Sequence, residues 1–245
     1  RDQFERQAAQ RVILRADTAL QAAGALSELG FDDALLTVDL PQGEQWHPLF
    51  IFLERLPNRV IAHGAADLQR ALAGEVLAPT EVEVELDRDV ATWMLANLDT
   101  VATVRDRLVA ALPNHSTLSA SQAADPDPAT LRRLGQAGVR LKNVPKCVAG
   151  AEVEAGDHGV LDAAMLDGSG DLDLDKYVAH YTDHEYYAKS VRCGLCAEAE
   201  RCRGMHISYV RNVGMAVLTP LDAAGQPLPD AASFDQLTER LQQAN

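Results

Sequence analysis

The sequence predicts an α/β protein, built as a partial or open parallel β/α barrel and followed by a cysteine-rich, mostly helical C-terminal segment. Over the first two-thirds of the 245 residues, short apolar runs alternate with longer amphipathic runs. Strands that alternate with helices form parallel sheets, because each helix carries the chain back to the same sheet edge. After Cys147 the composition changes, since Gly, Asp and Ala become frequent and periodicity fades. We therefore expect a β/α partial-barrel domain at 1–146 and a cysteine-rich iron–sulfur region at 147–245.

The first elements follow from local patterns. Residues 12–16 form a short apolar run typical of a strand, and the alanine-rich run 18–29 has helical spacing and stops at Gly30. Residues 34–40 are a second apolar run that ends before a proline, which predicts another strand. The following run, 46–56, favours a helix, although its period is mixed.

The next elements repeat this alternation. Residues 59–63 predict a short strand, and 65–73 predict the helix that follows it. Residues 81–86 alternate Glu with apolar side chains, which indicates a strand with one face toward water. The runs 87–97 and 101–112 both look helical.

The later elements are less regular. Residues 116–119 and 139–143 are weaker strand candidates on either side of a helix at 128–136. Residues 150–175 show little periodicity, and a last amphipathic helix is expected at 231–243, after two prolines.

The composition limits the class of protein. The formal net charge is −14 and the pI is near 4.8, so the surface repels phosphate backbones and we expect no nucleic-acid partner. No apolar run is long enough for a membrane span, and no signal peptide is visible. The four cysteines are too few for a disulfide-stapled secreted scaffold, so we expect a reducing, cytoplasmic location. Because the chain starts at Arg1 rather than Met, we expect residues upstream of it.

The most informative feature is the arrangement of the cysteines. Cys193, Cys196 and Cys202 follow the pattern C-x2-C-x5-C, and Cys147 precedes them in a Pro-x-Cys sequence. A C-x2-C pair lets two thiolates reach one metal centre without straining the backbone. The third and fourth cysteines complete a set of four soft sulfur ligands. This set indicates an iron–sulfur cluster or a zinc ion.

Other residues flank the three clustered cysteines. Lys189 precedes them, and four residues follow them: Gly204, Tyr209, Gly214 and Pro220. From about Val139 to Pro220 the chain resembles the C-terminal accessory-cluster region of radical S-adenosyl-L-methionine (SAM) proteins. In these proteins a Pro-x-Cys lies at the end of a partial TIM barrel, the place that Pro145-Lys146-Cys147 would take here.

The resemblance implies that Cys147, Cys193, Cys196 and Cys202 hold an accessory cluster of the 4Fe–4S type. It also implies that this chain alone does not cleave SAM, because the family's C-x3-C-x2-C motif is absent and no cysteine precedes Cys147. We therefore expect a subunit or accessory of a complete enzyme, which positions a substrate or relays electrons. Its partner would be another protein subunit, in a hetero- or homo-oligomer. The substrate, a peptide or a small molecule, is not specified by the sequence.

Two alternatives stay open. In the first, the same four thiolates bind zinc, and the protein is a binding or scaffolding module with a zinc-stapled tail. In the second, the chain is an independent enzyme with its active site at the strand ends of the barrel. Asp17, Asp39, His63 and Asp87 fall near the expected C-terminal strand ends, where β/α folds gather their chemistry. Each is also an ordinary cap or loop residue.

Three histidines are weaker candidates. His180 and His184 have the i, i+4 spacing of metal ligands, but no Glu follows His180, so a surface pair is favoured. His206 is close enough to Cys202 in sequence to replace a ligand, although four cysteines make this unnecessary.

Overall fold

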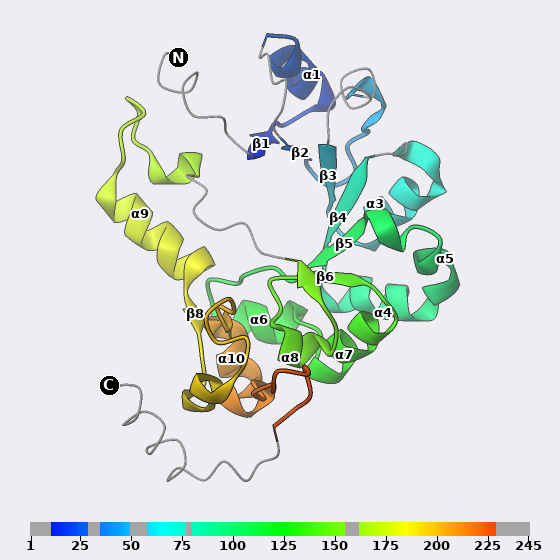
Figure 1. The fold of residues 1–245 in the computed structure, drawn as a ribbon. Helices are drawn as coiled ribbons and strands as arrows, with labels where there is room; N and C mark the ends of the chain where they lie inside the picture. The colour runs from blue at the N-terminus through cyan, green and yellow to red at the C-terminus, as the bar shows by residue number, and fades with distance from the viewer. Residues whose placement is uncertain (1–10, 29–34, 50–57, 77–79, 155–161, 229–245) are drawn as a thin grey trace. The chain divides into compact units, whose positions relative to one another are not determined.

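The computed structural model describes residues 11–28, 35–49, 58–76, 80–154 and 162–228. It confirms an α/β protein, because helices alternate with a seven-stranded parallel sheet (Figure 1). The strands lie in the sheet in the order in which they follow along the chain. They are β1 (Arg11–Arg15), β2 (Leu35–Asp39), β3 (Asn58–Ala62), β4 (Glu81–Glu85), β5 (Leu108–Ala111), β6 (Arg140–Lys142) and β7 (Val153–Glu154).

Helices connect these strands and continue beyond them. The α-helices are α1 (Ala19–Glu28), α3 (Ala65–Arg70), α4 (Arg88–Ala96), α5 (Leu98–Ala102), α6 (Leu118–Ala124), α7 (Pro128–Gln136), α8 (Lys146–Ala149), α9 (Leu174–His180) and α10 (Ile207–Val213). A short antiparallel ribbon joins β8 (Tyr187–Ala188) to β9 (Met205–His206). In the described part of the chain, no helix has the length and apolar composition that crossing a membrane requires.

The chain forms two compact units. Unit 1 consists of Arg1–Ala111 with Ala137–Arg140, and unit 2 consists of Leu112–Gln136 with Leu141–Asn245. All four cysteines belong to unit 2. The expected domain boundary between residues 146 and 147 stays a prediction.

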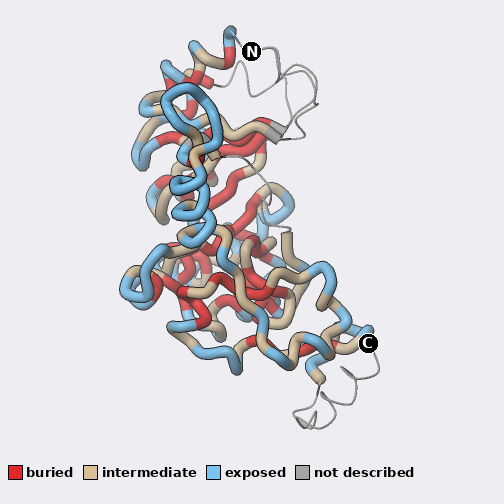
Figure 2. Tube along the Cα trace, turned by 90° about the vertical axis from the view of Figure 1, so that its left-hand side faces the viewer, coloured by how far each residue is buried: buried red, intermediate tan, exposed pale blue. Residues whose placement is uncertain are grey.

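The strands and the helices of unit 1 both contribute to its apolar core. All four residues of β5 are buried, and β3 and β4 each bury three or more of their five residues. Figure 2 shows the buried residues gathered along such segments, with exposed stretches of chain between them. Fully buried strands are typical of parallel sheets that helices cover.

Charged side chains are also paired inside unit 1. Arg59 on β3 is 4% exposed and donates to Glu83 at 2.8 Å and to Glu81 at 2.5 Å. Glu81 also accepts from Arg140 at 2.8 Å. The expectation that the glutamates of 81–86 face water is therefore wrong for Glu83, which is 8% exposed. A buried charge is tolerated here because an opposite charge is hydrogen-bonded to it.

Two predicted elements have the wrong type. Residues 101–112 were expected to be helical, but α5 ends at Ala102 and Leu108–Ala111 form β5. Since every β5 residue is buried, the strand lacks the alternation that distinguishes it from a helix. Residues 116–119 were expected to be a strand, but the Thr117 hydroxyl accepts the N–H of Ala120 and starts α6.

The other predicted strands are confirmed within one or two residues, as are the predicted helices that became α1, α4 and α7. The helix predicted at 65–73 is α3, which ends at Arg70 and continues as the π-helical turn Ala71–Glu75. Within the expected helix 46–56, the described part contains a 3-10 helix at His47–Leu49. The remainder of that segment and the expected helix at 231–243 lie outside the described residues.

Candidate functional site

All four cysteines are free thiols, partly exposed, and they lie in unit 2. Cys147 is on α8, which follows β6 after a short turn. Cys193 lies on the 3-10 helix Val191–Leu195, and Cys196 ends this helix as its C-terminal cap. Cys202 follows in the turns that lead into β9. Two segments well separated in sequence therefore supply the thiols.

Local hydrogen bonds fix the loop that carries three of the thiols. The Ser190 hydroxyl accepts the N–H of Arg192 at 3.3 Å and so caps the 3-10 helix. The N–H of Cys196 donates to the carbonyl of Cys193 at 3.1 Å, and the N–H of Cys202 donates to the carbonyl of Glu198 at 2.9 Å. The C-x2-C spacing thus becomes one tight turn, followed by a second turn at the third cysteine.

The titration of Cys147 and Cys193 indicates that the thiols are neighbours. Burial raises the pKa of Cys147 to about 12, and the negative charges of Cys202, Cys193 and Cys196 raise it further. Burial also raises the pKa of Cys193, and Cys202 and Cys196 act in the same direction. Because the effect of one charge on another weakens with distance, the other three thiols lie close enough to Cys147 for their charges to act on it.

Backbone N–H groups point at the sulfurs. Gly204 donates to the Sγ of Cys202 at 3.2 Å, and Leu221 donates to the Sγ of Cys196 at 3.3 Å. A hydrogen bond from the Thr219 backbone also opposes the rise in the pKa of Cys147. Such donors stabilise negative charge on sulfur, and they surround the thiolates of metal and iron–sulfur sites.

Gly204 has a physical reason to be glycine. Its φ is +93°, and a Cβ at this position would overlap the backbone carbonyl of Ala188 on β8. Only glycine allows this close approach without strain. The C-x-G pattern therefore fits the turn that aims the Gly204 N–H at the Cys202 sulfur.

Two lysines hold the cysteine-bearing segments. Lys146, which precedes Cys147, is 3.6 Å from Glu198 in the cysteine loop and also pairs with Glu152. Lys189 donates to the carbonyl of Ala199 at 2.6 Å and so closes the loop across its width. The Lys146 contact is one link between the α8 segment and the cysteine loop.

The donor set suits a soft metal ion or an iron–sulfur cluster, because thiolates supplied with N–H donors are the ligands that both prefer. Within the described ranges, no three Cys, His, Asp or Glu side chains stand in metal-ligating geometry. The residues that would hold such a group are Cys147, Cys193, Cys196 and Cys202.

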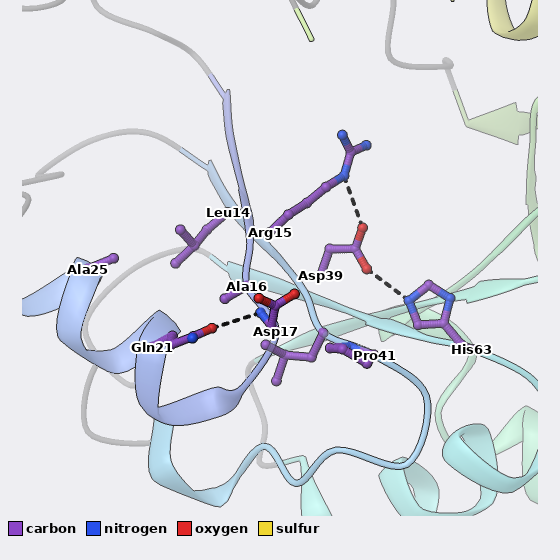
Figure 3. A pocket seen from close by; sticks show the side chains of 10 residues that line it. Leu14, Arg15, Ala16, Asp17, Gln21, Ala25, Asp39, Pro41 and His63 are labelled. Carbon is purple, nitrogen blue, oxygen red and sulfur yellow. Dashed lines mark hydrogen bonds and ion pairs between the residues drawn. The ribbon is translucent and has the colours of Figure 1, made fainter. Parts of the chain in front are cut away.

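A second candidate site lies at the strand ends of unit 1. A cavity of about 500 Å³ opens beside the ends of β1 and β2 and the first turns of α1. Figure 3 shows Arg15, Asp39 and His63 in a row on one side, and Asp17 with Gln21 beside α1. The remaining lining residues are mostly apolar: Leu14, Ala16, Ala25, Leu40 and Pro41.

His63 is held between two carboxylates. Its Nε2 is 2.8 Å from the Oδ1 of Asp39, and its Nδ1 is 2.9 Å from the Oε2 of Glu85. The hydrogen bond to Asp39, followed by that to Glu85, raises the pKa of His63 to about 10, although burial opposes this. His63 is therefore an imidazolium at neutral pH. Both ring N–H groups donate to these carboxylates, so the ring has no nitrogen left to accept a proton as a general base.

The Asp39 carboxylate forms ion pairs with two cations. Burial by itself would raise the pKa of Asp39, but the hydrogen bond and charge of His63 lower it below its usual value. Arg15 contributes in the same direction through a 3.2 Å ion pair. Arg15 and Glu85 were not among the predicted site residues, although each is the last residue of a strand and could have been found from that position.

The other strand-end candidates divide between the two interpretations. Asp87 is a helix cap, because its side chain accepts the N–H of Val90 at 2.7 Å at the start of α4. Asp17 lines the cavity, and its backbone N–H donates to the Oε1 of Gln21 at 3.1 Å. Asp87 is thus an ordinary helix cap, whereas Asp17 lines the cavity together with Asp39 and His63.

The remaining histidines lie elsewhere in unit 2. The rings of His180 and His184 contact each other at 4.6 Å between centroids, and His180 lies 3.7 Å from Asp162. His206 is 2% exposed, and burial lowers its pKa. Its Nδ1 accepts the N–H of Ser208 at 3.4 Å, which makes it the cap of α10.

The chain was compared with protein-family models, with curated proteins and with solved structures, and none of the three comparisons gave a match.

Proposed function

We propose that this chain is a radical-SAM-like iron–sulfur protein without its own SAM-cleaving cluster, and that it acts as a subunit or accessory of a complete enzyme. The observation that carries the proposal is the gathering of four thiols from two distant segments, with backbone N–H groups directed at their sulfurs. The sequential strand order supports a partial barrel, because doubly wound sheets reverse their order. The finer description, with a cysteine-rich C-terminal segment that is mostly helical, is part of this proposal.

A cluster bound by four protein thiolates supplies one-electron redox chemistry and offers no open iron to a substrate. Cys147, Cys193, Cys196 and Cys202 would hold it. The N–H groups of Gly204 and Leu221 would stabilise the charge on the sulfurs, and Lys189 would keep the loop closed around them. Residues 1–146 hold no cysteine, so another protein subunit or a segment upstream of Arg1 would bind and cleave SAM.

Anaerobic purification with elemental analysis and electron paramagnetic resonance tests the proposal. We expect about four irons and four sulfides per chain, and a paramagnetic signal on reduction. Cys196→Ala should lose this iron, whereas the neighbouring Leu195→Ala, which removes no thiol, should keep it. A colourless protein with one zinc per chain would refute the iron assignment and favour the zinc-stapled scaffolding module.

A second candidate function is an independent activity at the strand-end cavity of unit 1, and the clamped imidazolium favours it. Arg15, Asp39, His63 and Glu85 alternate in sign, so their charges offset one another. The charges that line the cavity balance, since Arg15 and His63 offset Asp17 and Asp39, and the Asp17 carboxylate is the exposed one that a ligand can reach. We infer that a small molecule with an ammonium group and an apolar body would bind there, with the ammonium paired to the Asp17 carboxylate.

Ligand-observed NMR with a panel of small amines and carboxylates tests this second candidate. We expect amines to bind the wild type and to lose affinity for Asp17→Asn. Asp87→Asn is the matched control, because this residue caps a helix and does not line the cavity. If no amine binds, or if Asp17→Asn binds as well as the wild type, the strand-end function fails and the iron–sulfur proposal is unaffected.

A further inference from the structure

Helix α9 and its continuation form an exposed segment in unit 2 (Figure 1). The π-helical turn Tyr181–Glu185 directly follows α9, and none of the described residues of either element is buried. Helices this short are only marginally stable in water unless an apolar face packs against something. We therefore expect this segment to pack against another molecule.

Four apolar or aromatic side chains share one face of this segment. Leu174, Tyr177, Val178 and Tyr181 stand at i, i+3, i+4 and i+7, the spacing of a single helical stripe. Their exposed fractions are 69%, 38%, 54% and 45%, and the rings of Tyr177 and Tyr181 stack at 6.4 Å. We call these four residues the α9 face. Its spacing is that of a helix that binds in the groove of another protein.

Unit 2 fixes the start of α9 without covering this face. The Asp173 carboxylate caps the helix by accepting the N–H groups of Asp175 and Lys176, each at 3.1 Å. The Lys176 ammonium donates to the carbonyl of Leu166 at 2.8 Å. These polar contacts hold the helix in place from its N-terminal end. The apolar stripe is left for a molecule outside the described part of the chain.

The charge around the α9 face specifies what that molecule carries. Asp171 and Asp175 are exposed beside the stripe, and the whole chain has a net charge of −14. A second copy would bring another acidic rim and a further −14 to the same place, which opposes association. A groove with an apolar floor and a rim of Lys or Arg complements both features of this surface.

We propose that the α9 face docks into an apolar, basic-rimmed groove of a different protein, in the manner of an amphipathic helix bound in a groove. The proposal rests on the proposed function in one respect, since the partner would be the subunit that this accessory chain serves. Tyr177, Tyr181 and Leu174 would supply the buried contact area. Asp171 and Asp175 would meet the basic rim.

Site-specific photocrosslinking in the native host provides the first test. Tyr177→p-benzoylphenylalanine places the crosslinker on the α9 face, and Tyr186→p-benzoylphenylalanine is the matched control. Tyr186 is a 46% exposed tyrosine that lies off the stripe. We expect the 177 variant alone to crosslink a different protein, through a peptide flanked by Lys and Arg. Crosslinks only to a second copy, or only to residues 229–245 of the same chain, would overturn the proposal.

The crosslinked protein is then purified and its affinity for this chain measured by calorimetry. We expect Val178→Glu to weaken binding by about tenfold or more. Leu20→Glu, which introduces the same charge at a 75% exposed leucine of unit 1, should change it less than twofold. Affinity should also fall as ionic strength rises. Equal binding by the wild type and Val178→Glu would overturn the docking proposal.

The iron content of the same samples separates this inference from the proposed function. Val178 lies outside the cysteine loop, so Val178→Glu should retain the wild-type iron and absorbance. Loss of docking with iron retained means that the α9 face is the interface. Docking by a protein that holds no iron supports this surface and refutes the iron–sulfur assignment alone.

Discussion

At the strand ends of unit 1, charges of opposite sign alternate, whereas in unit 2 the cysteine cluster gathers four groups that repel one another once ionised. His63 is an imidazolium because Asp39 and Glu85 flank it, and Asp39 in turn is paired with Arg15. Cys147 resists ionisation because it is buried and because the other thiols would be charged in the same way. In the first cluster every charge has a partner of opposite sign, whereas in the second the Lys189 ammonium offsets only part of the rise in the pKa of Cys193.

This difference teaches what each site needs. The His63 cluster is stable as the protein's own residues make it, so a ligand can add to it but is not required. The cysteine cluster has N–H donors aimed at sulfurs whose ionised form the surroundings otherwise disfavour. A bound cation would reverse that preference, since metal binding releases the thiol protons. Four predictions test this difference between the His63 cluster and the cysteine cluster.

The largest effect is expected at Gly204, where the cysteine cluster depends on backbone geometry. Gly204→Ala places a Cβ against the carbonyl of Ala188 at a φ of +93°, and it disturbs the N–H that donates to Cys202. We expect a loss of about 3 kcal/mol in the free energy of unfolding, measured by urea denaturation.

Gly194→Ala is the matched control in the same loop. Gly194 has no left-handed φ, and a Cβ there would meet no atom within 4 Å. We expect it to be nearly neutral. Equal destabilisation by the two substitutions would mean that the loop tolerates no side chain at all, and Gly204 would then have no special role.

The next prediction uses the pH dependence of the metal-free protein. The pKa of Cys147 is raised to about 12, from an ordinary value of 9.0, so the folded state keeps a proton that the unfolded state loses. The stabilisation is complete below about pH 9 and declines as the pH rises towards 12. The unfolding free energy of the wild type should fall by about 2 kcal/mol more than that of Cys147→Ala over this pH range, measured by denaturation.

Adding metal should invert the sign of that dependence. The bound thiolates would be the deprotonated form, so stability would then be lost as the pH falls. If the metal-loaded and metal-free proteins respond to pH in the same direction, the cysteine cluster does not bind the cation through its thiolates.

His63 should show a different pH window. Its folded pKa is about 10, above the ordinary 6.5, so its stabilisation is present below about pH 6.5 and lost as the pH rises through 10. Since 23% of the side chain is exposed, we expect about 1.5 kcal/mol after allowing for solvent screening. The difference in unfolding free energy between wild type and His63→Gln measures it.

A direct measurement of the imidazole titration accompanies this experiment. In NMR spectra, Asp39→Asn should lower the pKa of His63, because its Nε2–H then donates to a neutral amide oxygen instead of a carboxylate. Metal should leave this titration unchanged. A His63 that titrates near its ordinary pKa in the wild type would contradict the alternating charge cluster.

The sheet was predictable where its strands border polar residues. β1 to β4 are short apolar runs closed by charged residues or loop signals, and their positions were recognised from the sequence. β5 was not, because Leu108–Ala111 is buried at every residue and an alanine-rich apolar run fits a helix as well. Burial on both faces removes the period that identifies a strand.

The candidate sites show the same limit. The cysteine spacing indicated a metal-binding set, but only the fold brings Lys146 close to Glu198 and so links α8 to the loop. At the strand ends, Asp39 and His63 were expected, yet their pairing depends on the parallel register of β2, β3 and β4. Spacing along the chain reports local chemistry, whereas contacts between strands need the topology.

The smallest effect is expected for Asp17 and Asp87, which the sequence did not distinguish. Asp87 caps α4 by accepting the N–H of Val90, so Asp87→Ala should cost about 1 kcal/mol in unfolding free energy. The Asp17 side chain lines the cavity, so Asp17→Ala should change stability by much less and change amine binding instead. Denaturation and ligand-observed NMR on both variants give the four values required. If Asp17→Ala were as destabilising as Asp87→Ala, the Asp17 carboxylate would be structural, and it would not be the group that pairs with an amine in the cavity.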